Sequence, residues 1–136
     1  MSNTSKNPEY NPDEVQFLTD RINEEYSKYG NALPFSFCIR NKTNEIIAGC
    51  SGSLIYGSIY IDQLWVHPDH RSKGLGFELI ESVHSYGASK GCNIATVCTM
   101  SFQDAKDFYL KCGYTVDYER SGYIKNSKCL FLKRVL

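Results

Sequence analysis

The sequence lacks the features that would point to a membrane, an export route or a polyanionic partner. Nowhere do about 18 apolar residues follow one another, the length that a membrane-spanning helix needs. The first thirty residues are polar and hold no apolar stretch long enough for a signal peptide. Fifteen Lys and Arg residues balance fifteen Asp and Glu residues, so no net field attracts nucleic acid or anionic lipid. We therefore expect a cytoplasmic protein with no nucleic-acid and no membrane partner.

A metal-ligand pattern is also missing. The six cysteines form no C-x-x-C pair and have no histidine nearby at ligand spacing. They stand among apolar neighbours, at Cys38, Cys50, Cys92, Cys98, Cys112 and Cys129. Because a free thiol packs as a small hydrophobe, we expect reduced, mostly buried cysteines and no metal site. Disulfides are the alternative, which would require an oxidising compartment.

The length and the hydrophobic content predict one domain. The chain has 136 residues, 42% of them hydrophobic, which suffices for a single core. Residues 1–10 are rich in Asn, Ser, Lys and Pro without an apolar period, so we interpret them as a flexible N-terminal lead before a domain over 11–136. Asn11 can cap a helix that starts at Pro12, carries an apolar stripe and continues to Gly30. The stripe consists of Val15, Leu18, Ile22 and Tyr26.

The rest of the chain alternates between β-type and helical patterns. Strands are expected at residues 35–40, 45–55, 58–66, 93–100, 114–118 and 128–133. A helix is expected at 74–90, with Leu75, Leu79, Ile80 and Val83 on its buried stripe. Residues 101–104 have the form of a capping box that opens a last helix, whose inward residues are Ala105, Phe108, Tyr109 and Cys112. This order predicts an α+β fold with helices packed on a mixed sheet.

The most informative segment is residues 64–76, in which a strand passes through a turn into a helix. Exposed N–H groups at a helix N-terminus bind anions, and Gly74 and Gly76 let the backbone approach an oxygen atom closely. Arg71 and Lys73 add positive charge. The segment has neither the spacing of a P-loop nor the third glycine of a dinucleotide fingerprint. Its physical chemistry suits a pyrophosphate group.

Two blocks together resemble the GNAT superfamily of acetyl-CoA-dependent N-acetyltransferases. Arg71-x-x-Gly74-x-Gly76, after Leu64-x-Val66, is similar to the acetyl-CoA motif of that superfamily, written Q/R-x-x-G-x-G/A. Residues 105–114, Ala-x-x-Phe-Tyr-x-x-x-Gly-Tyr, are similar to its later motif. The resemblance implies a mostly antiparallel sheet with flanking helices, in which two splayed central strands, 58–66 and 93–100, hold acetyl-CoA.

The resemblance also implies which residues contact acetyl-CoA. The pyrophosphate would be held by Arg71, Ser72, Lys73, Gly74, Leu75 and Gly76, and the pantetheine would be lined by Leu64, Trp65 and Val66. From the later block, Ala105, Phe108 and Tyr109 would contribute to the same site. Tyr109 matches the tyrosine that protonates the leaving thiolate, with a core tyrosine as the alternative. Where some members carry a glutamate base, this chain has Tyr60, and Asp62 follows on the same strand face.

Several other residues have two interpretations. Asp62 is either the general base, acting through a water, or a solvated carboxylate. Trp65 belongs either to the core or to a wall of the acceptor pocket. The tyrosines of the tail, Tyr114, Tyr118 and Tyr123, form either a wall of the acceptor site or ordinary sheet surface. We expect no catalytic role for His67, His70 and His84, because the first two lie in the turn and the third lies on the following helix.

We therefore predict an acyltransferase that moves an acetyl group from acetyl-CoA to a primary amine of a small molecule, by direct attack in a ternary complex. A protein N-terminus or a lysine is the alternative acceptor. A protein that binds acetyl-CoA as a sensor or scaffold without turnover is the alternative of another class. The oligomeric state stays open between a monomer and a homodimer.

Overall fold

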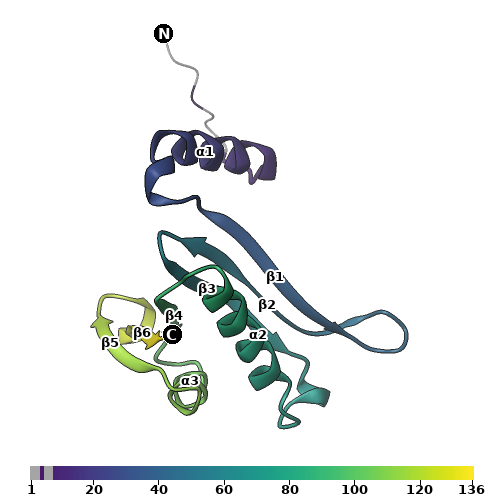
Figure 1. Ribbon diagram of the computed structural model, residues 1–136. Helices are drawn as coiled ribbons and strands as arrows, with labels where there is room; N and C mark the ends of the chain where they lie inside the picture. The colour runs from purple at the N-terminus through teal and green to yellow at the C-terminus, as the bar shows by residue number, and fades with distance from the viewer. Residues whose placement is uncertain (1–3, 5–7) are drawn as a thin grey trace.

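The computed structural model of the protein describes residue 4 and residues 8–136 (Figure 1). The predicted lead lies largely outside these residues, and residues 8–10 belong to no helix or strand. The elements are, in chain order, α1 (Pro12–Glu25), a 3-10 turn (Ser27–Tyr29), β1 (Leu33–Arg40), β2 (Ile46–Ile55), β3 (Ser58–Val66), a 3-10 turn (Pro68–His70), α2 (Leu75–Ser89), β4 (Ile94–Met100), α3 (Lys106–Lys111), β5 (Thr115–Arg120), a 3-10 turn (Ile124–Asn126) and β6 (Cys129–Val135).

The strands form one sheet in the order β1-β2-β3-β4-β6-β5. Within the described residues every neighbouring pair is antiparallel except β3 and β4, which run parallel. These two strands pair only over Ser58–Ile61 and Ile94–Val97, so their carboxyl-terminal halves are not bonded to each other. The mixed, mostly antiparallel sheet with splayed central strands is thereby confirmed.

One face of the sheet carries the core. Along β4 the side chains alternate, so that Ala95 and Val97 are buried. They join Ile59 and Ile61 of β3 and the buried stripe of α2, namely Leu79, Ile80 and Val83. Tyr109 and Cys112 of α3 and its C-cap enter the same cluster. The predicted apolar stripe of the helix at 74–90 and the inward side of the last helix are therefore confirmed, and both helices cover the same sheet face.

A β-bulge at Asp62 changes the course of β3. On β2, Ser51 pairs with Gln63 and Gly52 pairs with Ile61, which leaves Asp62 without a partner. Gly52 is required at this point because a Cβ atom there would collide with the carbonyl group of Tyr60. The bulge lies where β3 leaves β4, because the pairing of these two strands ends at Ile61.

Helix α1 begins as predicted but packs differently from the other helices. The Oδ1 atom of Asn11 accepts a hydrogen bond from the N–H of Asp13 at 2.9 Å, and Pro12 is the first helical residue. The helix ends at Glu25, and a 3-10 turn covers the remaining distance to Gly30. No residue of α1 is buried, and its apolar stripe stays exposed. In Figure 1 the helix stands beyond the end of the sheet, next to the start of β1.

The predicted capping box at 101–104 is wrong. Helix α3 begins only at Lys106, and no side chain caps its N-terminus. The Oγ atom of Ser101 instead accepts a hydrogen bond from the N–H of Lys128 at 2.9 Å, because the end of β4 lies beside β6. The amide oxygen of Gln103 accepts from the N–H of Met100 at 2.8 Å, which closes a turn before the helix. None of the helices in the described part of the chain is long and apolar enough to cross a membrane.

Candidate active site

The loop that precedes α2 presents backbone N–H groups that have no acceptor in the described part of the chain. Ser72 has a φ of 62° and Gly74 a φ of 84°, so two residues of the loop adopt the left-handed conformation. The first backbone bond of the helix runs from the N–H of Glu78 to the carbonyl of Gly74 at 3.0 Å. The N–H groups before Glu78 have no acceptor within the helix, and the dipole of a 15-residue helix stands behind them. Such an end binds anions.

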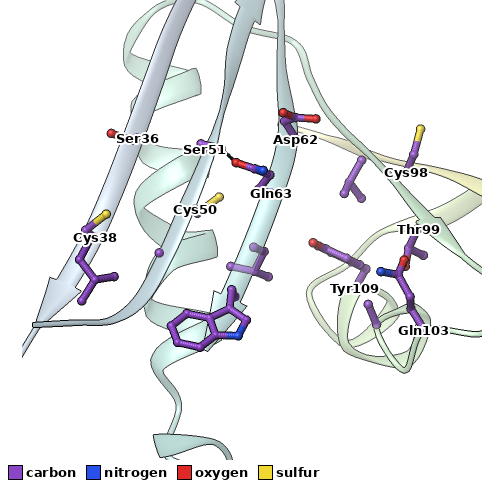
Figure 2. Close-up of a pocket in the computed structure, with 16 residues that line it drawn as sticks. Ser36, Cys38, Cys50, Ser51, Asp62, Gln63, Cys98, Thr99, Gln103 and Tyr109 are labelled. Carbon is purple, nitrogen blue, oxygen red and sulfur yellow. Dashed lines mark hydrogen bonds between the residues drawn. The ribbon is translucent and has the colours of Figure 1, made fainter. Parts of the chain in front are cut away.

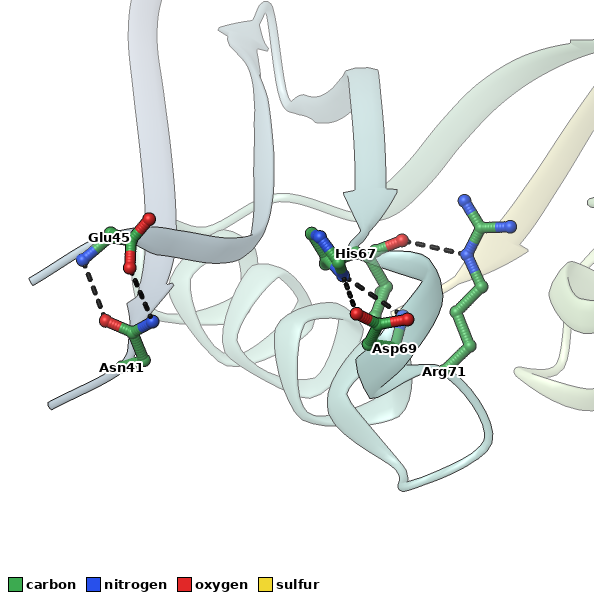
Figure 3. A network of polar contacts seen from close by, with 6 residues as sticks. Asn41, Glu45, His67, Asp69 and Arg71 are labelled. Carbon is green, nitrogen blue, oxygen red and sulfur yellow. Dashed lines mark hydrogen bonds and ion pairs between the residues drawn. The ribbon is translucent and has the colours of Figure 1, made fainter. Parts of the chain in front are cut away.

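Side chains of the turn hold this loop in place (Figure 3). The Nε atom of Arg71 donates a hydrogen bond to the carbonyl of Val66 at 2.8 Å, which ties the loop to the end of β3. The Nδ1 atom of His67 accepts from the N–H of Asp69 at 3.0 Å. Arg71 therefore stabilises the turn in addition to supplying charge. His67 supports the turn and is not among the residues that line the cavities described below.

A cavity of about 630 Å³ lies against this loop. Of the residues predicted to contact acetyl-CoA, it is lined by Leu64, Trp65, Val66, Arg71, Ser72, Gly74, Leu75, Gly76, Ala105 and Phe108. Lys73 does not line this cavity. Gly76 serves packing as well, because a Cβ atom there would lie 3.1 Å from the ring of Phe108. The left-handed loop, its free N–H groups and the adjoining cavity fit an elongated ligand that ends in a pyrophosphate.

A second cavity, of about 580 Å³, lies where β3 and β4 separate (Figure 2). It shares Leu64, Trp65 and Ala105 with the loop cavity, so the two adjoin along the end of β3. Asp62 at the bulge and Tyr109 of α3 both line it. We call it the reaction cavity. The fold thus brings together two residues that lie 47 positions apart in the sequence.

Tyr109 is a buried residue of the reaction cavity and is only 3% exposed. Its hydroxyl group forms no hydrogen bond among the described residues, and because no fully buried side-chain oxygen there lacks a partner, this hydroxyl is open to the cavity. In Figure 2 the phenol oxygen points across the cavity toward β3. Burial, together with the neighbouring thiols of Cys50 and Cys112, raises the pKa of Tyr109 well above its usual value. The phenol therefore keeps its proton at neutral pH and is available as a donor.

Asp62 and Tyr60 occupy different surroundings. Asp62 is exposed and lines the reaction cavity, whereas Tyr60 is not among the lining residues. Burial raises the pKa of Tyr60, and the Cys98 thiol beside it adds to this effect. A phenol with a raised pKa is a poorer base at neutral pH. Of the two candidate bases, the structure brings only Asp62 into the cavity that contains Tyr109.

The structure tests the interpretations that the sequence left open for Trp65 and for the tyrosines of the tail. Trp65 is 47% exposed and lines both cavities, so it is a wall residue and not part of the core. Tyr114 is 2% exposed and belongs to the core, so both of its interpretations, as an acceptor wall and as sheet surface, are wrong. Tyr118 and Tyr123 are exposed and line neither cavity. The three tyrosines of the tail therefore do not form one common surface.

Sequence reasoning missed the outer wall of the reaction cavity. This wall is formed by residues of three neighbouring strands, Ser36, Cys38, Ser51 and Gln63, and a hydrogen bond of 2.9 Å joins the Ser51 hydroxyl to the Gln63 side chain. One available signal was Gly52 inside a β-type run, since glycine in a strand often marks a bulge or a close backbone approach.

The cysteines are free, and four of the six are buried, which confirms the prediction of mostly buried thiols. Cys38 is exposed, and burial raises the pKa of Cys50 to about 11, so this thiol stays neutral. Among the described residues, no group of three His, Cys, Asp or Glu side chains is placed to hold a metal ion.

Comparison with solved structures shows the same fold. An acetyltransferase from Bacillus cereus ATCC 14579 is 22% identical, with a TM-score of 0.75 over 97% of this chain and 98% of that one. A protein described as an acetyltransferase from Agrobacterium tumefaciens is 20% identical, with a TM-score of 0.81 over 99% and 100%. A protein named as a streptothricin acetyltransferase from Bacillus anthracis str. Ames, solved with acetyl coenzyme A, is 17% identical, with a TM-score of 0.71 over 82% and 68%.

No curated protein matches the sequence. The sequence profile of the acetyltransferase (GNAT) family, however, matches residues 4–114, which covers most of the chain and includes the loop, Asp62 and Tyr109. Together with the loop cavity and the reaction cavity, this match makes the chain a member of the acetyltransferase (GNAT) family, whose members are acyltransferases that use acetyl-CoA as co-substrate.

Proposed function

We propose that the protein transfers the acetyl group of acetyl-CoA to a primary amine of a small molecule, by direct attack in a ternary complex. One observation carries the proposal: the phenol of Tyr109, which has no hydrogen-bond partner among the described residues, and the carboxylate of Asp62 line a single cavity, and this cavity adjoins the one at the loop before α2. Binding and chemistry thereby occupy neighbouring compartments along β3.

The loop supplies the binding energy for the pyrophosphate. The backbone N–H groups from Ser72 to Gly76 donate hydrogen bonds to phosphate oxygens, and Lys73 contributes charge from outside the cavity. The unpaired halves of β3 and β4 leave main-chain groups free along the path toward Tyr109. Leu64 and Val66 line this path, so an extended chain bound there points its far end into the reaction cavity.

The reaction needs a neutral amine, because an ammonium ion has no lone pair for attack. Acetyl-CoA supplies an activated acyl carbon when it is bound. Asp62 accepts the proton of the incoming ammonium group through a water molecule, which frees the lone pair. The new C–N bond forms as the C–S bond breaks, and the products are an amide and a thiol.

Tyr109 acts on the leaving sulfur. As negative charge develops there, the phenol donates its hydrogen bond and then its proton to the sulfur. The burial that raises the pKa of Tyr109 also disfavours the phenolate, so the phenol must regain a proton at once. The proton released by the attacking nitrogen balances this step. Asp62 passes the proton of the ammonium group through the water to solvent, so one proton is released per turnover and both side chains return to their starting state.

The charge in the reaction cavity favours a cationic acceptor. Asp62 is its single carboxylate, and no Lys, Arg or His side chain is among its lining residues within the described chain. A cationic amine therefore meets one attractive charge and no repulsive one. A cavity of about 580 Å³, part of which must hold the thioester, suits a small molecule better than a folded protein. A protein N-terminus or a lysine is the alternative acceptor.

A sensor or scaffold that binds acetyl-CoA without turnover is the candidate from another class. The feature that favours it is Tyr60, which stands where some relatives have a glutamate base.

One assay separates these functions. The purified chain is mixed with acetyl-CoA and a panel of amines that includes diamines, amino sugars and short peptides, and thiol release is followed. We expect release with at least one small cationic amine, with the acetylated amine confirmed by mass. Release with peptides alone would favour the alternative acceptor. Binding of acetyl-CoA without release across the panel would contradict the enzyme and favour the sensor.

A further inference from the structure

A polar network adjoins Tyr109 through Tyr114, and none of its members lines the reaction cavity. The Oη atom of Tyr114 lies 2.7 Å from Nε2 of His84, and Nδ1 of His84 lies 3.0 Å from a guanidinium nitrogen of Arg134. The same nitrogen of Arg134 donates to the carbonyl of Cys112 at 2.8 Å. These residues come from α2, the end of α3 and β6, so the network joins three elements at one point.

The chemistry of the network fixes the direction of its hydrogen bonds. A guanidinium group has only donors, so Nδ1 of His84 must accept from Arg134. The neutral imidazole then carries its proton on Nε2 and donates it to the hydroxyl of Tyr114. Burial, and then the charge of Arg134, lower the pKa of His84 to about 4. His84 therefore stays neutral near pH 7, and this arrangement of donors persists.

Tyr114 in turn contacts Tyr109 in two ways. Its N–H donates to the carbonyl of Tyr109 at 3.0 Å, and the two rings meet edge to face with centroids 5.5 Å apart. Phe108 contacts the Tyr109 ring on another side at 5.3 Å. Because the Tyr109 hydroxyl has no bond of its own in the described structure, the direction of its phenol is set by these packing partners.

We propose that Tyr114, held by His84 and Arg134, is a positioning residue that aims the phenol of Tyr109 at the leaving sulfur. The proposal rests on the function proposed above for Tyr109. A donor must lie within a fraction of an ångström of its productive position, and a locked neighbour supplies this precision. The hydroxyl of Tyr114 locks its ring, and without that bond the ring and the adjacent Tyr109 side chain gain freedom.

The test is a double-mutant cycle measured on the full chain. Tyr114→Phe keeps the ring and removes only its hydroxyl bond. We expect kcat to fall about 5- to 50-fold, with the KM for acetyl-CoA within about twofold of the parent. In a Tyr109→Phe background, Tyr114→Phe is expected to cause no further fall in kcat, because the group that it positions is already gone.

Two variants of His84 provide the matched control. The amide of His84→Gln can accept from Arg134 and donate to Tyr114, whereas His84→Leu can do neither. We expect His84→Leu to lower kcat by about the same factor as Tyr114→Phe, and His84→Gln to retain most of the activity. Rates are compared per folded protein, well below each melting temperature, so that lost stability alone does not lower them.

The outcomes separate the positioning role from the proposed function. Equal losses of kcat from Tyr114→Phe in the parent and in the Tyr109→Phe background would overturn the positioning role and leave the role of Tyr109 intact. So would a Tyr114→Phe enzyme whose kcat stays within twofold of the parent while Tyr109→Phe is impaired. If Tyr109→Phe alone leaves kcat unchanged, the role of Tyr109 fails and the positioning proposal fails with it.

Discussion

The loop before α2 and the reaction cavity are neighbours, but they are built in opposite ways. The loop is a local structure of six consecutive residues, Arg71–Gly76, and the groups that we propose bind the pyrophosphate are mostly its backbone N–H groups. The reaction cavity is assembled from side chains of β1 to β4 and α3, and its two reactive groups meet only after the sheet has formed. The difference implies that binding of acetyl-CoA and turnover can be lost separately.

A substitution at the bulge is expected to have the largest effect and to separate turnover from acetyl-CoA binding. Gly52→Ala places a Cβ atom against the carbonyl of Tyr60, so β2 and β3 must shift at the point where Asp62 enters the cavity. We expect a loss of about 3 kcal/mol in the free energy of unfolding, or roughly 10 °C in Tm, and near-complete loss of thiol release. The protein that remains folded should still be stabilised by acetyl-CoA, because the loop is local.

Gly49→Ala is the milder matched control for stability, since a Cβ atom there lies 3.3 Å from the Cys38 thiol and 3.4 Å from the Phe37 carbonyl, which requires only a small shift of these neighbours. A Gly52→Ala protein that melts within about 2 °C of the parent would show that the bulge does not depend on this glycine.

A substitution in the loop tests the binding of acetyl-CoA. At about 100 times its dissociation constant, acetyl-CoA should stabilise the parent by roughly 2.7 kcal/mol, seen as a thermal shift of several degrees. Gly74→Val should abolish this shift, because a β-branched residue is strained at a φ of 84° and its methyl groups obstruct the approach of a phosphate.

Gly57→Val carries the same backbone strain, at a φ of 84°, in the turn between β2 and β3, and should keep the acetyl-CoA shift. A folded Gly74→Val protein with an unchanged shift would place the pyrophosphate elsewhere.

A substitution of Asp62 tests its proposed role as the general base in the reaction cavity. An alkylammonium group has a pKa of about 10.4, so little free amine exists at pH 7. Asp62→Asn should lower kcat/KM about 10-fold below about pH 8, and a higher pH should restore much of it by supplying free amine. A pH-independent loss together with a lower Tm would indicate a packing role instead. Activity equal to the parent from pH 6 to 9 would exclude Asp62 as the base.

The smallest effect concerns His84, which lies outside both cavities. Its pKa is about 4 in the folded protein against 6.5 in the unfolded chain, so folding favours the neutral form. The stability that this provides is complete above pH 6.5 and is lost as the pH falls through 4. Besides Arg134 and Tyr114, the charged groups of Glu81 and Lys111 share a small cavity with His84.

We expect the Tm of the parent to fall more steeply between pH 6.5 and 4 than that of His84→Gln. The carboxylates titrate in the same way in both proteins, so the difference reports on His84. Parallel curves for the two proteins would show that His84 titrates normally.

Local patterns predicted the elements well. Asn11 and Pro12 fix the start of α1, and the stripe of α2 identifies its buried side, because capping and periodicity are properties of short segments. The capping box at Ser101 failed because its hydroxyl has a competing partner, the N–H of Lys128 just before β6, which no local pattern reveals. The exposed stripe of α1 is another difference, since periodicity shows that a helix has an apolar side and not what covers it.

The same difference between local patterns and contacts of distant segments applies to the candidate active site. The position of the loop before α2 was predictable because its conformation depends on consecutive residues. The choice between Tyr60 and Asp62 was not, because it depends on a bulge that Gly52 of another strand permits. The network of Tyr114 joins α2, α3 and β6, so its members gave no common signal in the sequence.

The most direct test of the account is kcat for Tyr109→Phe, measured by thiol release at saturating acetyl-CoA and amine, at a pH where chemistry limits the rate. The substitution removes one oxygen atom and nearly conserves packing. Because the phenol acts only on the leaving sulfur, we predict that kcat falls about 10- to 1,000-fold while the affinity for acetyl-CoA changes little. A kcat within twofold of the parent would contradict the account and make Tyr109 a structural residue.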